Sequence, residues 1–403
     1  MYSKKNEIPT TADDEIEGSV QGHRDGHGFV IRDDGEGDIY LPPNEMRAVL
    51  HKDRVRVRIV RQDRRGRPEG RVLEIIERPA QPIIGRLLNE AGIWLVAPED
   101  KRYGQDVLIP KTATGAAAVG QVVVVQLTEP PALYGQPVGR VAEVLGEVDD
   151  PGMEVEIAVR KYGVPHVFSD ACLAQAQALP DAVRAQDWRQ RVDLTDVPFV
   201  TIDGEDARDF DDAVYCEPAR IGRSKAWRLL VAIADVSHYV ESGGAIDTDA
   251  YDRATSVYFP RRVLPMLPEK LSNGLCSLNP QVARLAMVCD MIVSTKGDIH
   301  AYQFYPAVIE SHARLTYTEV AAVLANTRGP EASRLADRVK DLLNLHEAYR
   351  SLLAARHARG AVDFETTETQ IVCDDNGRIE KIVPRTRTEA HRLIEEAMLA
   401  ANV

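Results

Sequence analysis

The feature that most constrains the fold is an internal repeat in the first 150 residues. Four short segments recur in the same order, each displaced by 67 to 69 residues: 18–20 with 85–87, 38–42 with 106–110, 54–57 with 121–124, and 70–74 with 139–143. Four matches in one order at nearly one spacing are hard to obtain by chance, so the sequence predicts a tandem duplication. Each copy consists of short alternating segments separated by Gly, Asp, Asn or Pro, which is typical of a small antiparallel β-barrel.

One strand of the first copy is strongly basic. Over residues 54–60 arginine alternates with valine or isoleucine, so that Arg54, Arg56 and Arg58 share the face opposite the apolar core. Between residues 47 and 78 there are eleven Lys or Arg against five Asp or Glu. The corresponding strand of the second copy is nearly neutral. We therefore expect the second copy to be mainly a packing or guiding element.

Two aromatic residues of the first copy, Phe29 and Tyr40, lie in segments that look exposed. Small barrels bind single strands by neutralising the backbone and by stacking bases on such rings. Phe29, Tyr40 and the three arginines are therefore predicted to bind single-stranded RNA. The alternative is an ordinary solvated sheet face.

A second region is as acidic as the first is basic. Between Asp203 and Asp212 there are six carboxylates and one base, a local charge of −5, between two apolar segments that look like strands. Carboxylates held so close together either take up protons or share a cation, and Mg²⁺ is the natural partner of clustered oxygen ligands. This pattern predicts a Mg²⁺ site for phosphodiester chemistry.

A calcium-binding loop and a purely structural loop are the alternatives to this Mg²⁺ site. A calcium loop of the EF-hand type fails, because Arg208 stands where glycine is required and Val214 where glutamate is required. A structural acidic loop neutralised by nearby arginines stays open. Hydrolysis by two metal ions needs several converging carboxylates, and Asp209, Asp211, Asp212 and Asp203 can supply them.

Composition limits the remaining possibilities. The 403 residues are 44% hydrophobic and 28% charged, and the formal charge of −13 requires any nucleic-acid binding to be local. No apolar run has the ~20 residues of a membrane span, and the amino terminus has no signal-peptide core. Five widely spaced cysteines fit reduced thiols. We expect a cytoplasmic protein that does not associate with membranes.

The order of these features along the chain predicts the domain boundaries. We expect a disordered tail over residues 1–15, barrels over 16–79 and 80–148, a connector over 149–190, and an α+β catalytic domain over 191–403. In the last domain, apolar residues at helical spacing between 335 and 352 predict a long helix capped by Gly360. A final amphipathic helix is expected to begin with a capping box near Thr386.

Several of these segments together resemble the ribonuclease II/ribonuclease R family of exoribonucleases. Their sequences are closer to those of ribonuclease R. The resemblance lies in residues 201–214, 232–239, 256–260, 265–268 and 271–280. It implies two barrels of the OB/cold-shock type, then a catalytic domain that degrades single-stranded RNA from the 3′ end and releases 5′-monophosphates. RNA degradation by Mg²⁺-dependent hydrolysis is the implied function.

The resemblance also implies roles for individual residues. Asp203, Asp209, Asp211 and Asp212 would be the metal-binding catalytic aspartates, with Asp212 the one whose loss removes cleavage more than binding. Tyr258 and Phe364 would clamp the terminal bases. Glu396 would be the glutamate near the active site, with Glu395 as the alternative.

The match stops before the end of the family's catalytic domain. Nothing corresponds to the segment that carries the family's active-site arginine, or to the carboxy-terminal RNA-binding barrel. We therefore expect the catalytic domain to be incomplete at its C-terminus and to be complemented by a separate C-terminal portion or by other RNA-decay proteins. The alternative function is a catalytically impaired fragment that serves only as an RNA-binding or interaction protein.

Overall fold

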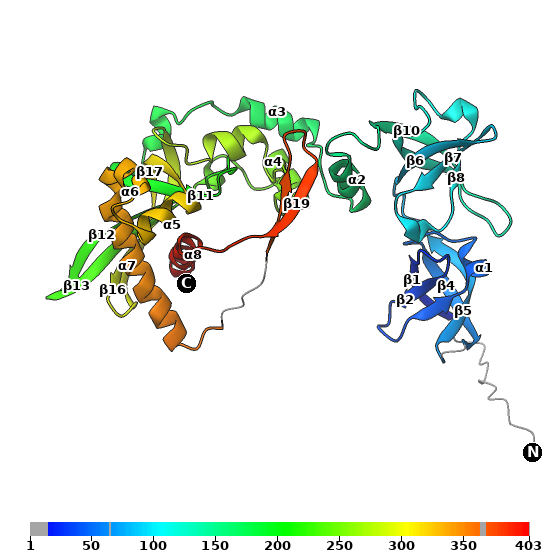
Figure 1. Cartoon of the computed structure of the whole chain (residues 1–403), viewed down its shortest axis with the longest axis horizontal. Helices are drawn as coiled ribbons and strands as arrows, with labels where there is room; N and C mark the ends of the chain where they lie inside the picture. The colour runs from blue at the N-terminus through cyan, green and yellow to red at the C-terminus, as the bar shows by residue number, and fades with distance from the viewer. Residues whose placement is uncertain (1–14, 64–65, 363–367, 403) are drawn as a thin grey trace, which may run out of the picture. The chain divides into compact units, whose positions relative to one another are not determined.

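The computed structural model describes residues 15–63, 66–362 and 368–402, and it divides into two compact units (Figure 1). The first comprises Met1–Val164 with Asn376–Arg378, and the second comprises Pro165–Asp375 with Ile379–Val403. Both units contain closed β-barrels, as the fold-class prediction requires for the amino-terminal part.

The first barrel is built by β1 (Glu15–Gly22), β2 (Gly28–Arg32), β3 (Ile39–Leu41), β4 (Arg54–Gln62) and β5 (Pro68–Glu77), with the short helix α1 (Pro43–Met46). Its strands close in the order β1-β2-β3-β5-β4. The apolar residues that alternate with arginine in β4 face the core as predicted, since Val55 and Val57 are fully buried. Glu15, which the sequence analysis assigned to the tail, is the first residue of β1 and pairs with Arg58 of β4.

The second barrel repeats this plan with β6 (Ile83–Glu90), β7 (Ile93–Pro98), β8 (Val107–Leu108), β9 (Val122–Glu129) and β10 (Val138–Gly146), closed as β10-β8-β7-β6-β9. Two 3₁₀ turns, Lys101–Tyr103 and Lys111–Ala113, lie between its strands. The repeated glycines have a steric reason. A Cβ on Gly18 or on Gly85 would collide with a carbonyl oxygen of the neighbouring strand, Ile31 in one barrel and Ala97 in the other.

The expected connector is divided between the two units. Helix α2 (Met153–Lys161) packs on the second barrel, where Met153 joins Ile84, Val122 and Val124 in one apolar cluster. Helix α3 (Asp170–Ala178) instead packs against α4 (Ala245–Arg253) within the second unit. A 3₁₀ turn at Ala185–Trp188 then leads into the main sheet.

That main sheet is itself a closed barrel, which the sequence did not predict. It consists of β11 (Val192–Asp203), β12 (Asp212–Ile221), β13 (Ser224–Ala234), β16 (Ala283–Ser294) and β17 (Ile299–Thr316). Parallel pairing of β11 with β17 closes it. Alternate residues enter two different apolar clusters, as with Val231 in one and Leu230 in the other, so both faces of the sheet are buried.

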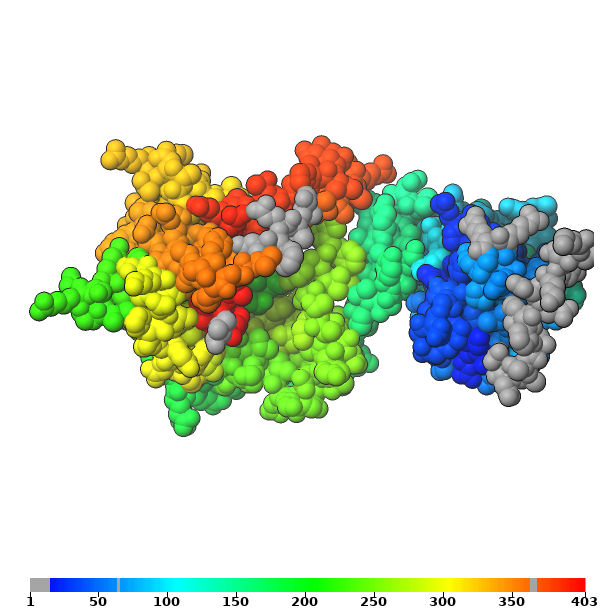
Figure 2. All heavy atoms as spheres, turned by 90° about the horizontal axis from the view of Figure 1, so that it is seen from below, coloured from blue at the N-terminus to red at the C-terminus, as the bar shows by residue number. Residues whose placement is uncertain are grey.

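Helices cover one face of this barrel. They are α5 (Tyr317–Ala325), α6 (Pro330–Arg334), α7 (Ala336–Ala358) and α8 (Glu389–Asn402). Helix α7 is the long helix that the sequence predicted, and Gly360 follows it with a φ of +81°. Both views place α8, in red, beside α7, in orange (Figures 1 and 2). The prediction of a capping box at Thr386 was wrong, because α8 begins only at Glu389.

The remaining elements are two hairpins and two short turns. The hairpins are β14 (Val257–Phe259) with β15 (Arg262–Leu264), and β18 (Thr369–Cys373) with β19 (Ile379–Pro384). A 3₁₀ turn lies at Val236–His238 and a π-helical turn at Lys270–Leu275. Across the described ranges, no helix is both long and apolar enough to cross a membrane.

Candidate catalytic site

The acidic residues gather where two neighbouring strands of the third barrel meet. Asp203 is the last residue of β11 and Asp212 the first of β12, and these strands are antiparallel partners through Val200 and Val214. Their facing ends are joined by residues 204–211, hereafter the acidic loop. The predicted set of four aspartates thus comes from two strand ends and the short loop between them.

The acidic loop is held by a segment distant in sequence. The Ser277 hydroxyl accepts a hydrogen bond from the Phe210 amide (3.0 Å) and donates one to the Arg208 carbonyl (3.0 Å). The Leu278 amide donates to the Phe210 carbonyl (2.9 Å). Both Ser277 and Leu278 are buried, so these bonds are shielded from water. Segment 271–280, which carried part of the resemblance, therefore holds the acidic loop in place.

Sequence reasoning missed a second support of the same loop, Arg314 on β17. Its Nη2 donates to the carbonyls of Glu205 (2.6 Å) and Ala207 (3.2 Å), and its guanidinium lies 5.1 Å from the centre of the Phe210 ring. Arg314 stands about a hundred residues from the loop and belongs to no motif, so nothing in the sequence singled it out. Its charge also lowers the pKa of Asp203 against the stronger effects described next.

Burial and mutual repulsion raise the pKa values of three aspartates of this site, so that they do not ionise readily at the same time. Burial, reinforced by Asp212, Asp211 and Asp209, raises the pKa of Asp203 to about 7. Burial and then Asp211 raise the pKa of Asp212 to about 6. Burial and the neighbouring Asp209 also raise the pKa of Asp211. Both desolvation and like-charge repulsion are therefore present, which is the condition that a bound cation relieves.

Two buried oxygen atoms also favour a bound cation, independently of the pKa values. Within the residues that the structure describes, the Oδ2 atoms of Asp203 and Asp212 are buried and have no hydrogen-bond partner. A buried polar atom without a partner costs about 1–3 kcal/mol, and more when it is charged. Oxygen donors of this kind fit a hard divalent ion such as Mg²⁺.

Tyr258, one of the two predicted clamp residues, contacts this cluster. It lies on β14, and its hydroxyl donates to Asp209 Oδ2 at 2.6 Å while the residue stays 62% exposed. Burial of the hydroxyl and its bond to Asp209 raise the pKa of Tyr258 to about 12, so it remains a donor at neutral pH. Phe364, the other clamp residue, lies outside the described residues.

The predicted glutamate, Glu396, has a different partner. It is only 4% exposed on α8, and Arg356 of α7 places its Nε 2.7 Å from the Glu396 carboxylate. Its neighbour Glu395 is ion-paired with Arg387. The observed contact of Glu396 is thus an interhelical ion pair, and its catalytic assignment still rests on the resemblance alone.

The first turn of α5 also borders the acidic site, which the sequence did not indicate. Tyr317 stacks on His391 of α8 with ring centres 3.9 Å apart. Burial, followed by Asp203 and Asp212, raises the pKa of Tyr317 to about 12. Thr318 donates to the Glu205 carboxylate at 2.6 Å. The starts of α5 and α8 thus enclose one side of the site.

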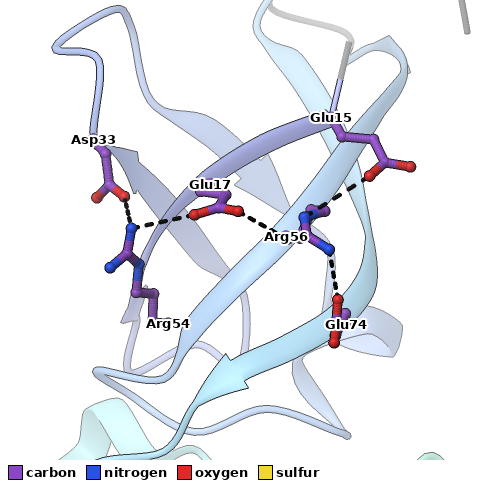
Figure 3. Close-up of polar contacts among 6 residues, drawn as sticks. All are labelled: Glu15, Glu17, Asp33, Arg54, Arg56 and Glu74. Carbon is purple, nitrogen blue, oxygen red and sulfur yellow. Dashed lines mark hydrogen bonds and ion pairs between the residues drawn. The ribbon is translucent and has the colours of Figure 1, made fainter. Parts of the chain in front are cut away.

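In the first barrel, the three arginines predicted to bind RNA are engaged in ion pairs. Figure 3 shows Arg54 and Arg56 of β4 paired with carboxylates of β1 and its surroundings. The pairs are Arg54 with Glu17 (3.2 Å) and Asp33 (2.6 Å), Arg56 with Glu17 (2.9 Å), Glu74 (2.6 Å) and Glu15 (3.8 Å), and Arg58 with Glu15 (3.0 Å). Antiparallel pairing with β1 and β5 places Glu15, Glu17 and Glu74 beside these arginines. The positive charge of β4 is therefore largely balanced within the barrel.

The predicted aromatic residues do lie together. The ring centres of Phe29 and Tyr40 are 5.9 Å apart, and the Arg67 guanidinium lies 5.3 Å from one and 5.0 Å from the other. His27 completes the group at 5.7 and 5.6 Å from these rings. We call these four residues the stacking cluster. Arg67 was missed because the sequence does not show which strands lie side by side, whereas His27 stands only two residues before Phe29 and was not singled out.

Comparison with known proteins agrees with this architecture. The RNB domain model matches residues 191–403, the Cold shock domain model 95–169 and the Ribonuclease B OB domain model 18–75. The chain is 47% identical to Ribonuclease R of Escherichia coli over 97% of its length and 48% of that protein. It is 46% identical to Ribonuclease R of Acidithiobacillus ferrooxidans over 87% of its length and 79% of that protein.

A solved structure is similar over almost the whole chain. The Mycoplasma genitalium RNase R in complex with ribose methylated single-stranded RNA aligns with a TM-score of 0.84 and 27% identity, covering 96% of this chain and 60% of that one. The present chain spans about half the length of the Escherichia coli relative.

Proposed function

This chain belongs to the ribonuclease R family, and from that premise we propose that its second unit hydrolyses single-stranded RNA from the 3′ end to 5′-nucleoside monophosphates. The observation that carries the proposal is the convergence of Asp203, Asp209, Asp211 and Asp212, two of them with buried oxygens that have no partner. We propose a cytoplasmic location for the same activity, consistent with the described helices, none of which could cross a membrane.

The four aspartates are the residues proposed to hold Mg²⁺. When bound, the ions supply Lewis-acid stabilisation of charge on the phosphodiester and make a water more acidic. The buried positions of Asp203 and Asp212 keep bulk water away, which strengthens every charge interaction at the site. Arg314 and Ser277 hold the loop that carries Asp209 and Asp211, and so fix the spacing of the set.

Tyr258 is proposed to serve two tasks at once. Its exposed ring offers a flat face on which a terminal base can stack, and its hydroxyl fixes Asp209. Base and reacting phosphate would thereby be positioned by one residue. For Phe364 and Glu396 we propose the roles that the resemblance implies. Phe364 would be the second clamp residue, and Glu396 the glutamate near the active site.

We propose that the first unit binds the RNA through the stacking cluster more than through β4. Phe29, Tyr40, His27 and Arg67 supply ring faces and a cation at one place on the barrel. Arg54, Arg56 and Arg58 contribute only as far as RNA phosphates replace their present carboxylate partners.

The test is degradation of 5′-labelled single-stranded RNA by the chain with and without Mg²⁺. We expect a ladder that shortens from the 3′ end, release of monophosphates, and complete arrest by a chelator. Asp212→Asn is expected to lower the rate by at least about 10²-fold, the typical cost of removing one preorganised catalytic group. Its matched control is Asp206→Asn, an exposed carboxylate of the same loop.

Equal cleavage by Asp212→Asn and wild type would show that the assigned chemistry is wrong. Salt-sensitive RNA binding without turnover at any Mg²⁺ concentration would instead favour the alternative of an RNA-binding protein.

A further inference from the structure

The turn between β1 and β2 carries the sequence His23-Arg-Asp25-Gly-His27, with metal-binding side chains at alternate positions. The His23 amide donates to the His27 carbonyl (2.8 Å), and the Gly26 amide donates to the His23 carbonyl (3.0 Å). Gly26 has a φ of +83°, which glycine adopts without cost. The hairpin therefore holds the two histidines opposite each other, with Asp25 at the tip of the turn.

The three side chains are already close to coordination geometry. Each offers one ligand atom within 4.8 Å of the other two, and His23 Nδ1 lies 3.4 Å from Asp25 Oδ2. A tetrahedral ion with bonds of about 2.0–2.1 Å needs ligand atoms about 3.3 Å apart. The His23–Asp25 pair meets that spacing. His27 needs to approach by at most about 1.5 Å, within the reach of a partly exposed side chain turning about its χ angles.

The local contacts show what an ion would replace. The Asp25 amide donates to His23 Nδ1 at a long 3.3 Å, and Arg24 lies 3.9 Å from the Asp25 carboxylate. The two imidazole rings are stacked with centres 4.3 Å apart. None of these contacts is buried, so displacing them costs little compared with three metal–ligand bonds.

The donor set selects a type of ion. Two imidazoles and one carboxylate suit borderline transition-metal ions, whereas Mg²⁺ prefers oxygen ligands alone. This set therefore differs in chemistry from the aspartates of the second unit. Three protein ligands also leave one position for water or another ligand.

We propose that His23, Asp25 and His27 form a binding site for a transition-metal dication of the zinc type on the first barrel. Since His27 belongs to the stacking cluster, the bound ion adds positive charge beside Phe29 and Tyr40. Tighter RNA binding with Zn²⁺ would follow, and that consequence rests on the proposed function, whereas ion binding itself does not.

The site is tested by titrating the chain with Zn²⁺ in excess Mg²⁺, with calorimetry giving stoichiometry and affinity. His27→Phe removes the ligand nitrogen but keeps an aromatic ring beside Tyr40, and Asp25→Asn weakens the carboxylate. We expect His27→Phe to lose one bound ion, and Asp25→Asn to bind it at least about tenfold more weakly. His300→Ala, at an exposed histidine of the second unit, is the matched control and should bind as wild type does.

Titration with Co²⁺ separates the possible ligands. Binding at this site gives visible ligand-field bands without the thiolate charge-transfer band that a cysteine site would show, and these bands disappear in His27→Phe. Unchanged stoichiometry and spectrum in His27→Phe, with its thermal unfolding matching wild type, would overturn the proposal. RNA affinity measured with and without Zn²⁺ reports separately on the link to the stacking cluster.

Discussion

At the scale of single residues, the protonation of the acidic site is coupled to folding. Asp203 and Asp212 have pKa values of about 7 and about 6 in the folded protein, above their ordinary value of 3.8. The folded state therefore binds more protons than the unfolded state between about pH 4 and about pH 7. The stabilisation from these protons is complete below pH 4 and is lost as the pH rises through 7.

This linkage predicts how Mg²⁺ binding depends on pH. Protons compete with Mg²⁺ for the same oxygens, so the affinity should rise between about pH 5.5 and about pH 7.5 and then level off. Calorimetric titration at several pH values measures the trend. Asp206→Asn, the exposed control in the same loop, should leave it unchanged, and an affinity independent of pH would contradict the assigned pKa values.

The ring and the hydroxyl of Tyr258 can be separated by two substitutions. Tyr258→Ala removes the stacking face and should weaken RNA binding by about 1–3 kcal/mol, roughly 5–150-fold. Tyr258→Phe keeps the ring and removes the hydroxyl that bonds to Asp209, so it should bind RNA nearly normally but degrade it more slowly. Filter binding and single-turnover rates distinguish the two. Equal loss of affinity in both variants would argue against stacking.

At the scale of elements, the pairing of β1 with β4 decides how much of the basic strand is available. Glu17 lies between Arg54 and Arg56 and bonds to both, and these arginines lower its pKa. Exposed ion pairs of this kind contribute little to stability. They can nevertheless keep RNA phosphates from the arginines by occupying their donors.

Removing this internal competitor should therefore strengthen RNA binding. Glu17→Gln is expected to raise the affinity of the chain for single-stranded RNA several-fold and to steepen its dependence on salt, because about one more phosphate contact forms. Glu36→Gln, an exposed carboxylate of the same barrel, changes the net charge equally and serves as the control. An identical gain in both variants would show that only net charge matters.

At the scale of the whole molecule, two units with separate cores should respond separately to metal. Val20, Val30 and Val57 belong to a core in the first unit, and Leu229 and Leu345 to another in the second. Ligand that binds only the folded state of one unit stabilises that unit alone. Mg²⁺ should thus shift only the transition of the second unit in a calorimetric scan.

Two variants assign the transitions. Asp203→Asn should abolish the Mg²⁺ shift while leaving both transitions present, and His27→Phe should not affect it. A single transition that Mg²⁺ shifts as a whole would show that the two units unfold as one.

From the sequence alone, the two small barrels and the acidic cluster could be predicted, whereas the third barrel could not. Alternating residues and the internal repeat predict the small barrels, because strand periodicity is a local property of the chain. The four aspartates were found because they fall within ten residues, so their mutual repulsion is visible without a structure.

Which distant groups meet these residues depends on the three-dimensional fold. Groups that lie far apart in the sequence meet at these sites: Arg314 and Tyr317 at the acidic site, Arg67 in the stacking cluster, and the carboxylates paired with Arg54. The barrel closure by β11 and β17 was missed for the same reason. Pairing across a sheet is a long-range property, and it turned a predicted basic face into a balanced network of ion pairs.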